Sequence, residues 1–231
     1  TKSGENTRYN STCSQYQSGG NNANYTCLVQ MWWWDGDGTW TINATIRDNS
    51  EAEAINDTRT FQVSETTGFA LSPGNLTFAT LTIGAVNQTA NNAPLLLNNT
   101  GNKDIARTAI SINATNLVGE ADSSKELYSG NFSIGNTTGS SLECLYAGTS
   151  FATRLNYTLS GGSFVNISTA EMNASNFTIN NGREGQEQLY LCLLLVGSEL
   201  NQQSYSTRVN GPWTVQVLQI LPLLRHLEIA F

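Results

Sequence analysis

Histidine is almost absent from this chain, which has a single one, His226, among its 231 residues. A Ser-His-Asp or Cys-His nucleophile would have to be built on that side chain, and nothing near it in the sequence supports such a site. The chain has no C-x-x-C pair to ligate zinc and no glycine loop of the P-loop or dinucleotide-binding type. We therefore expect a protein that is not an enzyme and has no metal or cofactor.

Charge is also scarce, and the little present is mostly acidic. Charged residues make up 13% of the chain, and 18 acidic against 11 basic residues give a net charge of −7. Such a chain has no basic surface for nucleic acid or for an anionic membrane. The longest apolar region, 218–231, is too short for a membrane-spanning helix and contains Arg225, His226 and Glu228. No signal-peptide pattern occurs, so we expect a mature chain whose leader has been removed.

A few acidic clusters in the sequence do not have the spacing of a calcium site or of a catalytic pair. The stretch "DGDG" at 35–38 lacks the later glutamate of an EF-hand, so a hairpin turn is the better interpretation. The pairs Glu51/Glu53 and Glu184/Glu187 could be imagined as glycosidase acids, but solvated charges explain them more simply.

Short apolar segments separated by Gly, Asn and Ser run along the whole chain and predict an all-β protein. We expect two immunoglobulin-like or adhesion-type β-sandwich units. In the first, over 1–66, "NYTCLVQMWWWD", "TWTINATIRDN" and "TRTFQVSE" predict three strands, so this unit is one strand short. The second, over 67–217, has seven or more strand-like segments. In it, "PLLLNNTGN" followed by an alternating strand resembles the adhesion-type sandwich modules of microbial surfaces.

N-x-[ST] sequons indicate the compartment. Random placement of the chain's 27 asparagines and 49 serines and threonines would give about six sequons. In nine of those present the middle residue is apolar, so on a strand the asparagine would point outward and its neighbour inward. We predict heavy N-linked glycosylation and no other bound group. The chain has fourteen sequon asparagines: Asn10, Asn24, Asn43, Asn56, Asn75, Asn87, Asn98, Asn113, Asn131, Asn136, Asn156, Asn166, Asn173 and Asn176.

The four cysteines point to the same oxidising, extracellular setting. Cys13 and Cys27 are close in sequence, whereas Cys144 and Cys192 lie far down the chain. Three connectivities are possible, and we expect the local pairing 13–27 with 144–192.

The triple tryptophan and the apolar end of the chain are candidate interfaces. If residues 24–34 form a strand, Trp32 and Trp34 lie on its outer face, where they could stack on sugars or contact another subunit. The alternative is a core covered on both faces. The segment 218–231 fits a strand, with Pro222 marking its start, and also fits a helix. As a strand it places five large apolar residues on one face, namely Leu221, Leu223, Leu227, Ile229 and Phe231.

A strand-poor unit at one end and an apolar segment at the other predict head-to-tail assembly, in which the segment of one copy completes unit 1–66 of the next. On "YTCLVQMWWWDGDGTWTINATIRDN" and "PLLLNNTGNKDI" the chain resembles archaeal cell-surface proteins. With its dense sequons it is similar to archaeal thread-type filaments and other donor-strand fibres. The resemblance implies a cell-surface filament of identical subunits. In that family the donated segment is usually N-terminal, whereas here it is C-terminal.

Two other interpretations remain open. The chain could be a monomeric adhesin or carbohydrate-binding module that binds surface glycans through Trp32 and Trp34, or a surface-layer domain of a longer protein. A secreted hydrolase is a more distant alternative.

Overall fold

The computed structural model of the chain describes residues 7–20, 22–136, 153–155, 163–174, 185–218 and 223–230. The chain divides into two compact units, unit 1 over Thr1–Thr66 and unit 2 over Thr67–Phe231. The regular structure of the described residues is strand, apart from one short 3-10 helix, η1 (Ser129–Asn131). The all-β prediction is therefore confirmed.

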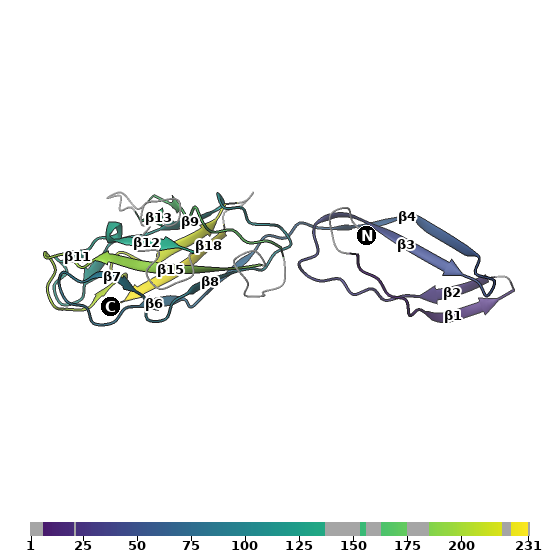
Figure 1. Cartoon of the computed structure of the whole chain (residues 1–231), viewed down its shortest axis with the longest axis horizontal. Helices are drawn as coiled ribbons and strands as arrows, with labels where there is room; N and C mark the ends of the chain where they lie inside the picture. Colours follow the sequence, from purple (N-terminus) through teal and green to yellow (C-terminus); the bar gives the residue numbers. More distant parts are fainter. Residues whose placement is uncertain are drawn as a thin grey trace. The chain divides into compact units, whose positions relative to one another are not determined.

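Unit 1 contains two separate antiparallel ladders (Figure 1). The strand β1 (Ser14–Gly19) pairs with β2 (Asn22–Thr26), and β3 (Gly38–Arg47) pairs with β4 (Glu53–Val63). The turn between β3 and β4 is closed by Asp48, whose carboxylate accepts hydrogen bonds from the amides of Ser50 (2.7 Å) and Ala52 (3.0 Å). The stretch "DGDG" ends where β3 begins and is not this turn, so the hairpin-turn prediction at 35–38 is wrong.

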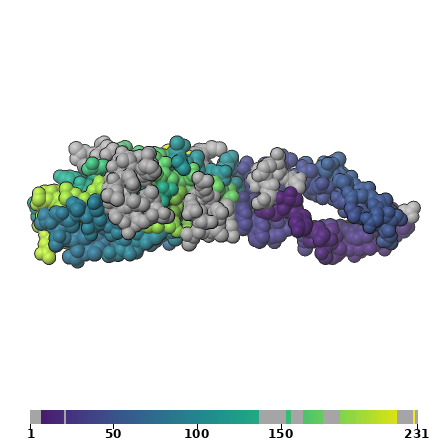
Figure 2. Space-filling view, in the orientation of Figure 1, coloured from purple at the N-terminus to yellow at the C-terminus, as the bar shows by residue number. Residues whose placement is uncertain are grey.

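The alternation predicted for β3 is present, but most of its apolar face is uncovered. Trp40 lies opposite Phe61, stacks on it with ring centroids 6.3 Å apart, and is 1% exposed. Farther along the same face, Ile42 and Ile46 remain 48% and 60% exposed. Figure 2 shows β3 and β4 at the surface of unit 1. A two-stranded ladder with a single buried anchor is marginal in water, which agrees with the expectation of a strand-poor unit.

The strand predicted over 24–34 ends at Thr26, and residues 27–37 lie outside the strands. The reason is a turn over residues 32–35, which contains the three tryptophans. The Asp35 carboxylate accepts the Trp32 amide at 2.7 Å, and the Asp35 amide donates to the Trp32 carbonyl at 3.0 Å. Those bonds compete with a ladder, as aspartate side chains commonly do.

Unit 2 contains two sheets that share one core. The larger has the strand order β11-β10-β16-β18-β17-β9-β14, with β6 paired to β18, and the smaller has the order β13-β12-β15-β8-β5, with β7 paired to β15. The strands, in chain order, are β5 (Phe69–Ser72), β6 (Asn75–Thr77), β7 (Val86–Thr89), β8 (Leu95–Asn99), β9 (Ile110–Asn113), β10 (Leu117–Gly119), β11 (Glu126–Leu127), β12 (Phe132–Gly135), β13 (Thr153–Arg154), β14 (Val165–Asn166), β15 (Gln186–Leu195), β16 (Tyr205–Ser206), β17 (Trp213–Val217) and β18 (Leu223–Ala230).

Aromatic rings join the two sheets of unit 2. Phe132 of β12 lies edge-on to Trp213 of β17 with centroids 5.2 Å apart, and both side chains are buried. Phe78 also contacts Phe132 edge-on, with ring centroids 5.9 Å apart. The Trp213 indole donates to the Thr115 carbonyl at 2.8 Å, so its one polar atom is satisfied inside the core.

Glu187 of β15 is a buried carboxyl group at the edge of this core. Its Oε2 accepts the Glu171 amide at 2.9 Å, and Glu171 in turn pairs with Arg107 at 3.1 Å. Burial raises the pKa of Glu187 to about 7, partly opposed by its hydrogen bonds. The folded protein therefore binds this proton more tightly than the unfolded chain does.

We expect the free energy of unfolding to fall as the pH rises from about 4.5 to about 7, by up to roughly 3 kcal/mol, and to level off above that range. Because glutamine imitates the protonated side chain, Glu187→Gln should remove this fall. Urea unfolding at pH 5 and pH 8 measures it, with the exposed Glu199→Gln as the control. An unchanged pH dependence in Glu187→Gln would contradict the assignment.

Candidate functional site

The apolar segment near the end of the chain forms an inner strand of unit 2. β18 pairs antiparallel with β17, from Leu223 opposite Val217 to Leu227 opposite Trp213. It also pairs in parallel with β6, where Ile229 is the partner of Leu76, and antiparallel with β16 at Ala230 (Figure 1). The strand alternative for this segment is therefore the one adopted.

This placement corrects the expectation that the segment leaves its own unit to complete unit 1. Ile229 is 1% exposed, and the Thr207 amide donates to its carbonyl at 3.0 Å. β18 lies in unit 2 between β17 and β16. On their other edges β17 pairs with β9 and β16 pairs with β10, so in the described sheet only β18 joins the two halves. Of the other interface residues predicted here, Leu223 and Leu227 are in β18, whereas Leu221 and Phe231 lie outside the described residues.

The sequon asparagines of the described chain are never buried. Eight are exposed, at positions 10, 24, 43, 56, 75, 87, 166 and 173, and four are half-buried, at 98, 113, 131 and 136. Asn156 and Asn176 lie outside the described residues. Among the half-buried side chains, Asn136 donates its amide, the atom that would carry a glycan, to the Thr169 carbonyl at 2.8 Å.

The predicted inward position of the middle residue depends on the unit. In unit 2 the middle residues Leu76, Ala114, Phe132 and Ile167 are all buried in the core. In unit 1 the middle residue Ala44 is exposed, because the ladders there have no second layer. These four residues anchor their segments in the core, whereas Ala174, the middle residue after Asn173, is half-buried.

The first predicted disulfide is present. Cys13 and Cys27 are bonded, with their Cα atoms 4.4 Å apart, and join the segments that flank the β1–β2 hairpin. Cys192 is buried in β15, whereas Cys144 lies outside the described residues, so the second pairing stays a prediction.

The three tryptophans of unit 1 form an indole cluster, Trp32–Trp34, on a loop. Trp32 and Trp34 are stacked with centroids 5.1 Å apart and 5° between their planes, and Trp33 lies edge-on to Trp34 at 5.2 Å. Trp32 and Trp33 are 47% and 44% exposed. The predicted division into an inner Trp33 and outer Trp32 and Trp34 is wrong, because the segment is not a strand.

An ion pair that the sequence did not predict supports this loop. Arg8 binds the carboxylate of Asp35 through its Nε at 3.1 Å and through a second contact from Nη2, and Asp35 is 2% exposed. The two residues are 27 positions apart, and no pattern in the sequence links them. The carboxylate that caps the Trp32 turn is thereby both buried and neutralised.

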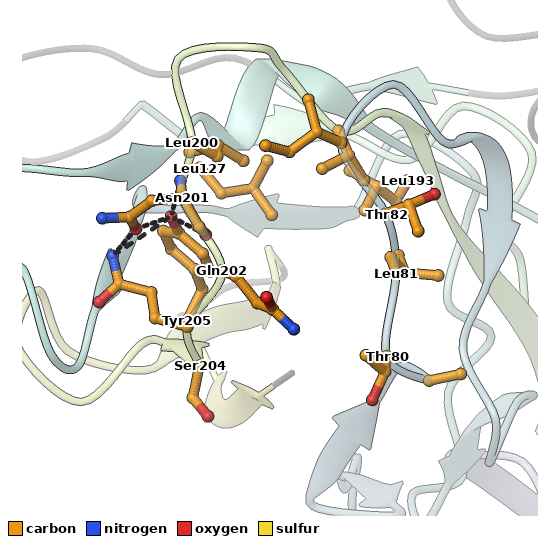
Figure 3. Close-up of a pocket in the computed structure, with 14 residues that line it drawn as sticks. Thr80, Leu81, Thr82, Leu127, Leu193, Leu200, Asn201, Gln202, Ser204 and Tyr205 are labelled. Carbon is orange, nitrogen blue, oxygen red and sulfur yellow. Dashed lines mark hydrogen bonds between the residues drawn. The ribbon is translucent and has the colours of Figure 1, made fainter.

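Unit 2 has a cavity of about 550 Å³ between the segment 79–83 and the loop that leads to β16 (Figure 3). Leu81, Leu127 and Leu200 line its apolar side. On the polar side, the Tyr205 hydroxyl donates to the Asn201 carbonyl at 3.0 Å and accepts the Asn201 amide at 3.1 Å. These bonds hold the loop together, so the polar wall has a structural role in the fold.

Of the acidic pairs considered for catalysis, Glu184 lies outside the described residues, and the expectation of solvated charges is wrong for Glu187. Glu53 and Glu51 lie 2.8 Å and 3.6 Å from Arg47 at the β3–β4 turn, and Glu187 is buried. Within the described residues no cluster of three or more His, Cys, Asp or Glu side chains is arranged to hold a metal ion. No helix in that part of the chain is long and apolar enough to cross a membrane.

Comparison of the chain with protein-family models and with curated proteins finds no match. The candidate sites therefore rest on the geometry described above.

We expect a chain ending at Val217 to lose the fold of unit 2. It would leave β17, β6 and β16 without their shared partner. The net free energy of unfolding of a domain is small, so we expect that a sheet without this inner strand does not stay folded. Near-ultraviolet circular dichroism should report this loss, and a peptide spanning 218–231 should restore the signal. As a matched control, Ile229→Val should stay folded and lose about 0.5–1.5 kcal/mol. A truncated chain with the native spectrum would contradict the role of β18.

We also expect the fraction of molecules that carry a glycan at a given sequon to be higher where the asparagine side chain is more exposed. In protein purified from its native source, mass spectrometry of glycopeptides should find glycans on exposed asparagines such as Asn75 and Asn87, and the lowest occupancy at Asn136. Asn75→Gln should remove one glycan without changing the fold. Unmodified peptides at both exposed sites would contradict the prediction.

Proposed function

We propose that this chain is a structural subunit of an extracellular, N-glycosylated surface filament whose copies are joined head to tail through β18. The observation that carries the proposal is the inner position of β18 among β17, β16 and β6. Every copy needs a strand in this position, and the strand is joined to β17 by residues 218–222 alone.

The main-chain hydrogen bonds of β18 are the same whichever copy supplies the strand. Exchange between copies requires the β17–β18 connection to open, after which the strand enters the same position in a neighbour. Because the donated strand and the position that accepts it are different surfaces, this contact is heterologous and need not close on itself. Repetition gives an open filament of identical subunits, with unit 2 as the acceptor instead of unit 1.

Two further features support an extracellular location. The Cys13–Cys27 disulfide is of the kind that persists in oxidising compartments, and eight exposed sequons offer glycan sites over both units.

A cross-strand cysteine pair distinguishes exchange from folding within one chain. Thr214 of β17 lies opposite His226 of β18, and Cα separations across an antiparallel pair fall within the range that a disulfide spans. Under oxidising conditions, Thr214→Cys/His226→Cys should give a ladder of covalent multimers on a non-reducing gel. Electron microscopy of the same sample should show fibres.

Each single variant is the matched control, because one added thiol per chain can link two chains at most. If the double variant forms its new disulfide only within single chains, β18 stays in its own unit and assembly by exchange is wrong.

A further inference from the structure

The indole cluster of unit 1 has no role in the proposed assembly, which uses only unit 2. Trp32 has one face against Trp34 and is 47% exposed, so much of the ring lies on the surface. Trp40 in the same unit is 1% exposed, so a tryptophan of this unit can be buried where the fold requires it. Large apolar side chains grouped at a surface usually mark a binding site.

The cluster is held in a fixed arrangement. The Asp35 carboxylate accepts the Trp32 amide at 2.7 Å and is itself bound by Arg8. After Asp35, the carbonyl of the buried Gly36 accepts the Trp40 indole N–H at 2.9 Å, which joins the loop to the one aromatic side chain that is buried among the described residues of unit 1. A binding surface organised in this way loses little conformational entropy when a ligand arrives.

The chemistry of the loop favours an uncharged ligand. Arg8 and Asp35 neutralise each other, so neither offers a free charge to an ionic group. An acidic chain without a basic cluster repels phosphates, which argues against a nucleotide. Two exposed indoles cover much less area than a stable protein–protein interface needs.

We propose that the indole cluster Trp32–Trp34 binds neutral saccharides, with a pyranose ring stacked on Trp32. The positively polarised C–H groups on one side of a pyranose match the negative face of an indole, and the ring's hydroxyl groups stay in water. Trp33, edge-on to Trp34 and 44% exposed, offers a second contact beside the first. The site is independent of β18 and of the filament.

Titration of the full chain with a β-1,4-linked glucose hexasaccharide and with an α-linked mannose hexasaccharide tests the site. We expect at least one of them to change tryptophan fluorescence and to give a binding isotherm by calorimetry at concentrations up to about 10 mM. Trp32→Ala should weaken that binding at least tenfold, whereas Trp32→Phe, which keeps a flat ring, should recover part of it. Tyr9→Ala removes an aromatic that is 84% exposed outside the cluster and should change nothing.

Three outcomes would overturn the proposal. The first is that neither saccharide binds, and the second is that Trp32→Ala binds as well as the natural chain. The third is that Trp32→Ala abolishes self-association in the absence of saccharide. The last would assign the cluster to a contact between copies. Near-ultraviolet circular dichroism of Trp32→Phe separates loss of binding from loss of the loop, because Trp33 and Trp34 remain as reporters.

Discussion

The main-chain pairing of β18 is the constraint on which unit 2 depends. It joins β17, which leads to β9 and β14, to β16, which leads to β10 and β11, and it also holds β6. Without it the larger sheet separates into three pieces, β16 with β10 and β11, β17 with β9 and β14, and β6 alone, and β17, which carries Trp213, becomes an edge. The aromatic contact between Trp213 and Phe132 joins the two sheets, so the packing of the smaller sheet also depends on this strand.

Sequence alternation predicted the all-β class, the boundary near residue 66 and individual strands such as β3 and β17, because period-two patterns reflect burial of one face. It failed over 27–37, where a local hydrogen bond to Asp35 outweighs an apolar run. It also assigned β18 to unit 1 of a neighbouring copy, whereas this strand lies in unit 2. An apolar strand signals that it must be buried, but not which sheet accepts it, since the partners Leu76 and Trp213 are far from one another in sequence.

The two candidate surfaces differ in how far the sequence could define them. A sequon is a local pattern, so its asparagines could be identified from the sequence alone. The buried middle residues of unit 2 explain how a strand can be anchored in the core while a sequon asparagine on it stays accessible. The indole cluster depends on Arg8 and Asp35, which meet only in the folded loop. Its residues could be named from the sequence, whereas their stacking could not.

The parallel pairing of β6 with β18 has a consequence for the order of events during biosynthesis. Asn75 must wait for Glu228 before its strand gains this partner, so the larger sheet stays open until nearly the whole of this stretch has been synthesised. Unit 1, whose ladders use only residues before 64, is free to form much earlier. During that interval β6, β16 and β17 each have an edge without the partner that β18 later supplies.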